Sequence, residues 1–161
     1  QLMWAKKIGL DNNNQLLTNE LLNLMVLSKA DYTIFFRKLS HIPENISVLK
    51  DSFYLPLTNE LENKWNAWLK KWLDCIKKNT DFKSISKSMK NINPKYTWRE
   101  WMIAPAYEEA EKGNYNKIKE LQTIFSNPYE EQSLEIEQKY DRLKPIEFFN
   151  NGGISHYSCS S

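Results

Sequence analysis

The sequence predicts an all-α protein, and three observations support this fold class. Apolar residues recur at steps of three and four along most of the 161 residues, which is the period of a helix and not that of a strand. Glycine is scarce, and its four residues all stand where segments are expected to end. No run alternates apolar and polar residues as a half-buried strand does.

Three helices are predicted in the first forty residues. A short helix over about Leu2 to Ile8 ends at Gly9. The apolar stripe of the second helix consists of Leu16, Leu17, Leu21, Leu24, Met25 and Ser28. Asp31 stands at the N-cap position of the third helix, and Pro43 marks its end. The residues expected to face inward from this helix are Ile34, Phe35 and Leu39.

A connecting loop and a long helix are predicted next. The segment 41–58 contains two prolines and no sustained period, so we expect a loop with at most about one helical turn. A long helix then begins at Asn59, with lysines on its outer side. Its apolar stripe consists of Leu61, Trp65, Trp68, Leu69, Trp72, Leu73 and Ile76. Three tryptophans on one stripe predict a large buried area.

The remaining sequence predicts shorter helices. Asp81 can cap a helix that runs to about Lys90, and the breaker 91–94 follows it. A helix over about Tyr96 to Lys112 then ends at Gly113. Its apolar side consists of Trp98, Trp101, Met102 and Tyr107. Pro105 removes a backbone hydrogen bond inside this helix, so we expect a kink there or a restart near Ala104.

Two further helical stretches and a tail complete the prediction. One helix covers Tyr115 to Phe125, with Ile118, Leu121 and Phe125 inward, and is stopped by Asn127-Pro128. A last stretch covers Glu130 to Lys139. We therefore expect one helical region over residues 1–145 and an irregular tail over 146–161.

Composition and charge exclude several classes of function. The net charge of +2 provides no one-sign field, so neither nucleic acid nor an anionic membrane is indicated as a partner. The longest apolar run, near Leu21 to Leu27, is interrupted by Asn23 and is far shorter than the roughly 20 residues of a membrane span. The two cysteines and two histidines lack metal-ligand spacing, so we expect neither a zinc site nor a disulfide scaffold.

Other candidate chemistry is weak. Glutamates cluster at 108–111 and 130–137, but such runs on helices are mostly solvated faces and not acid–base pairs. No glycine-rich phosphate loop precedes a helix. Basic residues among aromatics could form a stacking platform for single-stranded nucleic acid, although core packing is the more common role. The residues of that platform are Lys95, Tyr96, Trp98, Arg99 and Trp101, with Arg37 and Arg142 as similar arginines elsewhere.

The two cysteines have different settings. Cys75 lies one helical step from Trp68 and Trp72, so we expect it to be a small buried hydrophobic residue. Cys159 has no periodic context, stands two residues from the end, and follows His156 by three residues. A redox role fits it better than hydrolysis, because a terminal tail supplies no oxyanion site; an incidental free thiol is the alternative.

Four segments, in this order, resemble the selenoprotein O (SelO/YdiU) family. The first runs from Lys29 to Ser40 and includes Asp31-Tyr32-Thr33-Ile34-Phe35-Phe36-Arg37. The second covers 93–101, with Asn93-Pro94-Lys95-Tyr96 and Trp98-Arg99-Glu100-Trp101. The third comprises 110–115 and 127–129, and the last is Tyr157-Ser158-Cys159-Ser160-Ser161. The match is weakest over 42–90.

The resemblance implies the helical C-terminal part of a protein kinase-like fold, long called a pseudokinase. It implies an intact enzyme that transfers AMP from ATP, with Mg²⁺ or Mn²⁺, to hydroxyls of protein substrates. The family's catalytic, nucleotide-binding and metal-binding residues match nothing here, so we expect them in an N-terminal kinase-like lobe and expect the chain alone to be inactive. Cys159 stands where some members carry selenocysteine, which implies a redox-regulatory role.

The sequence also bears on the extent of the chain, on rival functions and on the cellular compartment. The chain begins at Gln1 within an expected helix, which suggests a fragment. A self-contained helical module that binds protein or nucleic acid is the rival interpretation, and phosphorylation is the rival reaction. The resemblance implies a mitochondrial protein if eukaryotic and a cytoplasmic one if bacterial.

Overall fold

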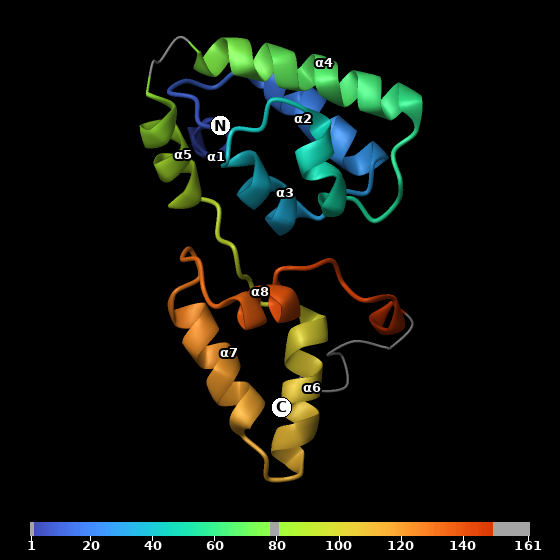
Figure 1. Ribbon diagram of the computed structural model, residues 1–161, viewed down its shortest axis with the longest axis vertical. Helices are drawn as coiled ribbons and strands as arrows, with labels where there is room; N and C mark the ends of the chain where they lie inside the picture. Colours follow the sequence, from blue (N-terminus) through green and yellow to red (C-terminus); the bar gives the residue numbers. More distant parts are fainter. Residues whose placement is uncertain (1, 78–80, 150–161) are drawn as a thin grey trace. The chain divides into compact units, whose positions relative to one another are not determined.

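The computed structural model describes residues 2–77 and 81–149, which belong to two compact units that meet in the chain between Lys95 and Tyr96 (Figure 1). The first unit contains α1 (Leu2–Lys7), α2 (Gln15–Leu27), α3 (Tyr32–Leu39), the 3₁₀ helix η1 (Ile46–Ser52), α4 (Asn59–Ile76) and α5 (Phe82–Lys90). The second contains α6 (Glu100–Glu111), α7 (Asn116–Ser126), α8 (Leu134–Tyr140) and the 3₁₀ helix η2 (Ile146–Phe148).

The described residues form an all-α fold, as the sequence predicts. They include no strand, and their one β-bridge joins Ala30 to Phe53. Side-chain caps start the helices where expected, because a carboxylate can satisfy an otherwise unpaired backbone N–H in the first turn. The Asp31 carboxylate accepts from the Ile34 N–H at 3.1 Å, and Asp81 accepts from Ser84 in the same way. None of the described helices combines the length and the apolar character that crossing a membrane requires.

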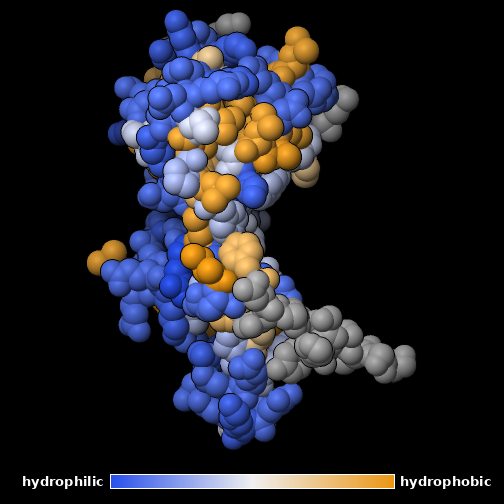
Figure 2. All heavy atoms as spheres, turned by 90° about the vertical axis from the view of Figure 1, so that its right-hand side faces the viewer, coloured by the Kyte–Doolittle hydropathy of each residue, from blue (hydrophilic) through white to orange (hydrophobic). Residues whose placement is uncertain are grey.

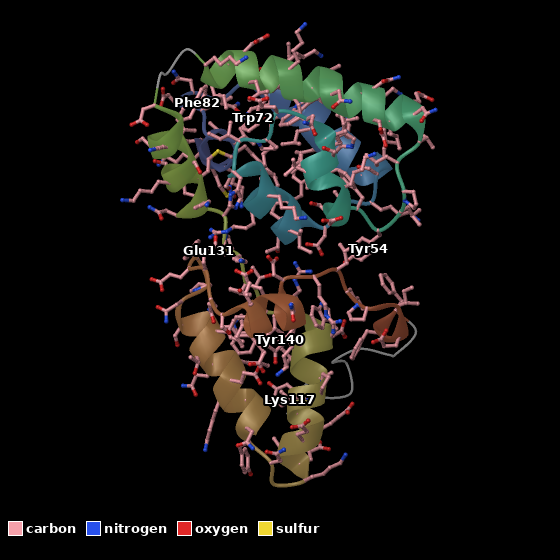
Figure 3. All side chains as sticks on the ribbon, in the orientation of Figure 1. Tyr54, Trp72, Phe82, Lys117, Glu131 and Tyr140 are labelled. Atoms are coloured by element: carbon pink, nitrogen blue, oxygen red, sulfur yellow. The ribbon has the colours of Figure 1, made fainter. Side chains whose placement is uncertain are left out.

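The core of the first unit is built on the three tryptophans of α4, all of which are fully buried. Their indole N–H groups donate to three different segments: Trp65 to Ser28 Oγ (3.2 Å), Trp68 to Leu17 O (2.9 Å) and Trp72 to Ile8 O (2.7 Å). Trp72 points from α4 into the unit (Figure 3). A buried tryptophan contributes hydrophobic surface and a polar N–H, so each ring here also fixes a neighbouring segment.

Two details of the first unit differ from the prediction. Leu16 is 82% exposed, although it belongs to the predicted apolar stripe of α2. The stripe that is buried consists of Leu17, Thr18, Leu21, Leu24 and Met25. The 41–58 segment contains a 3₁₀ helix of seven residues, longer than the single turn expected. It buries Ile46, Leu49 and Ser52 at steps of three, which is the 3₁₀ period and not the α period.

The second unit packs α6 against α7, and α8 adds Tyr140 to their core (Figure 3). The chain turns between α6 and α7 at Gly113, whose φ of +84° confirms its predicted role after the helix end. The buried residues of this core are Tyr96, Trp101, Met102, Ala106, Leu121, Ile124 and Tyr140.

Several boundaries in the second unit were predicted wrongly. Helix α6 begins at Glu100 and not near Tyr96, since the backbone at its N-cap, Arg99, is extended (φ −126°, ψ 136°). The Tyr96 N–H donates to Pro128 O at 3.1 Å. Helix α6 continues unbroken through Pro105, so the restart near Ala104 is wrong. Trp98 and Tyr107 are exposed and do not face the core. The last helix begins after its cap Ser133, later than Glu130. The proposed separation of a 146–161 tail stays a prediction.

Candidate functional site

The predicted redox residue, Cys159, lies outside the described residues, as does His156. Cys75 is a free thiol near the end of α4. It packs against the core of the first unit but is only partly buried, so the prediction of full burial is wrong in degree. Its side chain faces the edge of the core because the stripe of α4 is centred on the tryptophans.

The structure brings one segment that resembles a known family, 29–40, against Asn93, the first residue of the next such segment. The Arg37 guanidinium, 4% exposed, extends from α3 to the end of α5. Its Nη1 donates to Lys90 O at 3.1 Å and to Asn93 O at 3.3 Å. The Lys90 carbonyl is one of the acceptors that the end of α5 leaves unpaired, and a cation there opposes the negative end of the helix dipole. Arg37 therefore connects α3 to the breaker after α5.

Asn93 is the centre of this contact and is completely buried. Its Nδ2 donates to Lys7 O at 2.8 Å and to Ser40 Oγ at 3.0 Å. Its Oδ1 accepts from Lys7 Nζ at 3.0 Å. Both amide hydrogens and the amide oxygen are therefore used, which no other residue of this size can reproduce. We call Lys7, Arg37, Ser40 and Asn93 the Asn93 junction.

Lys7 brings the only ammonium group of the Asn93 junction. Its Nζ lies 5.1 Å from the centre of the Tyr32 ring and 5.0 Å from that of Phe36. Burial lowers the pKa of Lys7 and raises that of Tyr32. The two ring faces and the Asn93 oxygen replace part of the water that the ammonium loses. The junction thus binds α1 to α3 through polar contacts and offers no nucleophile paired with a base.

A groove of ≈ 460 Å³ lies beside the junction, between the end of α1 and α5. Its lining residues are Lys6, Gly9, Leu10, Asp11, Asp81, Ser84, Ile85, Ser88 and Ile92. The charged residues of this lining are two carboxylates, Asp11 and Asp81, and one ammonium, Lys6. The groove is therefore negative on balance and would repel the phosphates of a nucleotide. Within residues 2–77 and 81–149, no three His, Cys, Asp or Glu side chains are grouped so that they could hold a metal ion.

Gly9 lines this groove at a point where α5 closely approaches the end of α1. A Cβ at Gly9 would lie 2.7 Å from Ile85 Cγ2 and 2.8 Å from Met89 Sδ, and its φ is +70°. Glycine is therefore required here both by the left-handed backbone and by the close approach of α5. The sequence indicated a helix end at Gly9 but not this contact.

The aromatic platform considered above is not assembled in the second unit. Tyr96 and Trp101 are buried in the core, and Trp98 alone among the three rings is exposed. Trp98 stacks on Phe125 with centroids 4.6 Å apart. The Arg142 guanidinium lies 5.4 Å from the Trp101 ring, as core packing with an arginine over it predicts.

Glu109, from the first of the two glutamate clusters, forms an ion pair and a hydrogen bond near the surface. Glu109 pairs with Lys117 at 2.7 Å and accepts from Asn114 at 3.1 Å. An ion pair on the surface of two neighbouring helices is the ordinary role of such residues, and it contributes little to stability.

Comparisons with known proteins bear on these segments directly. A family model described as "Protein adenylyltransferase SelO" matches residues 1–126. This chain belongs to the SelO family. A protein of Flavobacterium johnsoniae named "Protein nucleotidyltransferase YdiU" is 32% identical over 99% of this chain and 32% of its own length. Similarly named proteins of Tolumonas auensis (29% identical, 100% of this chain, 31% of their own length) and Pseudomonas aeruginosa (32%, 81% and 27%) also match.

The match to the SelO family includes the whole Asn93 junction and extends to the end of α7. Both segments that meet at Asn93 lie within it. The chain spans about a third of the length of the curated relatives it matches. In the first two family segments, Arg37, Ser40 and Asn93 have a structural role, because they hydrogen-bond the end of α3 to the segment after α5.

Proposed function

We propose that this chain is the helical C-terminal part of a protein adenylyltransferase of the SelO type. The intact enzyme transfers AMP from ATP to Ser, Thr or Tyr hydroxyls of protein substrates. The observation that carries this proposal is the family match over residues 1–126 in a chain that spans about a third of its relatives. The relatives' printed name, protein nucleotidyltransferase, supports the class of reaction.

The described residues do not fit ATP or its divalent metal, so we derive no catalytic step from them. The groove beside α5 is lined by Asp11 and Asp81, and Asp81 is already engaged as a helix cap. We assign nucleotide, Mg²⁺ or Mn²⁺ and catalytic groups to the remaining two thirds of the protein, a kinase-like lobe. The role of this chain is to complete that fold, with the Asn93 junction holding its first, third and fifth helices in place.

The proposal is tested with the full-length protein of this reading frame. The purified protein is incubated with Mg²⁺ and ATP that carries label on either the α- or the γ-phosphate, together with a protein substrate mixture. Label from the α-phosphate is expected on protein, with the mass increase of AMP. Label from the γ-phosphate alone would indicate a kinase, and a reading frame without a further lobe would refute the assignment. Residues 1–161 alone are the matched control and are expected to transfer neither label.

Cys159 is proposed as the redox-regulatory residue of the intact enzyme. In this proposal its thiol and a second thiol outside this chain lose two protons and two electrons to a disulfide oxidant such as oxidised glutathione, and an S–S bond forms. Non-reducing peptide mass spectrometry of the full-length protein and of its Cys159→Ser variant provides the test. Identical disulfide maps and an equal response of activity to oxidant would contradict it.

A further inference from the structure

Helix α2 presents an outer face without any charged residue. The exposed residues of α2 are Gln15, Leu16, Asn19, Asn23, Val26 and Leu27. Their spacing of three and four places Leu16 to Leu27 along one side of the helix. The only charged residue of α2, Glu20, is bound to Lys71 of α4 at 2.9 Å.

The large apolar side chains of this face are open to solvent in the described residues. Leu16 is 82% exposed, Val26 78% and Leu27 61%. Leu55 extends the same region, because it follows Tyr54, whose N–H donates to Lys29 O just after α2. Apolar side chains also gather on the face of the first unit that Figure 2 shows.

The neighbouring helix α4 provides an internal comparison. Its exposed residues include Glu60, Lys64, Lys70, Lys71 and Asp74, as expected for a helix whose outer side faces water. Three of the six exposed residues of α2 are, in contrast, apolar, and the other three are uncharged. Depletion of charge together with exposed apolar residues is the signature of the centre of a protein interface. The outer face of α2 is therefore built to be covered.

We propose that this α2 face docks against the part of the SelO-family polypeptide that this chain does not span. The inference rests on the proposed function, and the missing length supports it: this chain covers 32% of the Flavobacterium johnsoniae relative. A second copy of the chain is the weaker occupant. A 13-residue helix is about 20 Å long, and a face about 10 Å wide gives about 200 Å², well below the roughly 800 Å² per partner of a stable complex. A covalently continuous segment needs less area, because it loses little translational freedom on docking.

The test is site-specific labelling of the full-length protein. Val26→Cys places a thiol on the α2 face, and Ala67→Cys places a matched thiol on the exposed side of α4. Maleimide incorporation at each site is followed by peptide mass spectrometry, in native buffer and in guanidinium chloride. Labelling at Val26→Cys is expected to be slower than at Ala67→Cys by about tenfold or more in the native protein, since a covered site reacts only on opening. The two rates are expected to be equal in guanidinium chloride.

Equal native rates at the two sites would overturn the docking proposal. Protection of Val26→Cys that disappears on dilution would overturn it in favour of a second copy. These outcomes are separate from the labelled-ATP assay: a protein that transfers AMP but shows equal rates retains its proposed function and loses only the docking surface. A reading frame without a further lobe would refute both.

Discussion

Replacement of Asn93 by leucine is the sharpest test of the Asn93 junction. Leucine has the same branched arrangement of side-chain heavy atoms as asparagine but bulkier methyl groups, so the change removes the hydrogen bonds without leaving a cavity and adds some overpacking at this buried site. Lys7 O loses its donor at 2.8 Å, and Lys7 Nζ loses its acceptor at 3.0 Å. An unpaired buried carbonyl costs about 1–3 kcal/mol, and a partly exposed ammonium adds less than a buried one. We expect a loss of about 2–4 kcal/mol in the free energy of unfolding.

Two further variants distinguish the loss of the Asn93 hydrogen bonds from the general effect of replacing an asparagine. Asn63→Leu alters an exposed asparagine of α4 and is expected to change the stability by less than about 0.5 kcal/mol. Asn93→Asp keeps an oxygen for Lys7 but places a carboxylate against Lys7 O at a position where Nδ2 donates. It is therefore expected to be destabilising at neutral pH, and less so in acid, where the protonated carboxyl group can donate.

The assay is urea unfolding of the 161-residue chain, followed by tryptophan fluorescence and far-UV circular dichroism. Three buried tryptophans report on the first unit directly. Hydrogen exchange of the α1 amides gives a local measure, because α1 is the helix that Asn93 binds to the rest. A stability of Asn93→Leu within about 0.5 kcal/mol of the parent, or equal to that of Asn63→Leu, would refute the reasoning.

Three other predictions concern the backbone and one ion pair. Gly9→Ala is expected to lower the free energy of unfolding in urea by about 2–4 kcal/mol, and Gly113→Ala by only about 1–2 kcal/mol. Both glycines have a positive φ, but only Gly9 lacks room for a Cβ. Equal losses for the two variants would contradict this reasoning. Lys29→Gly is expected to stabilise by about 0.5–1 kcal/mol, because the exposed Lys29 has a φ of +48°, and a lower Tm would count against it. The hydrogen bond to Glu120 raises the pKa of Lys139 above 10.5, so the stability that this pair contributes is present below that pH and is lost as the pH rises through the folded pKa. The difference in Tm between the parent and Lys139→Met should therefore shrink above pH 10.5, and a constant difference would argue against the pair.

Local signals account for what was predicted correctly about the fold. The caps at Asp31 and Asp81, the stripe of α4 and the turn at Gly113 all depend on contacts within a few residues of the chain. The 3₁₀ helix η1 was not predicted from the sequence. Its buried residues repeat every three positions, and only three such residues are too few to form a recognisable pattern. Trp98 and Trp101 were predicted to lie on the same face of one helix, but Trp98 is exposed and Trp101 is buried. Helix α6 begins only at Glu100, so Trp98 precedes it and does not follow its period.

The sequence by itself determined the helical class, most helix positions and the membership suggested by the short segments around Arg37 and Asn93. Only the tertiary structure decided what those segments do. The hydrogen bonds between Lys7 and Asn93 join residues 86 positions apart, and no local period encodes such a partner. Tertiary structure also decided which side of α2 is buried. The apolar residues of α2 were evident in the sequence, but which of them face the core depends on how α4 packs against the helix. Periodicity places residues on one face of a helix, and the neighbouring elements decide whether that face is covered.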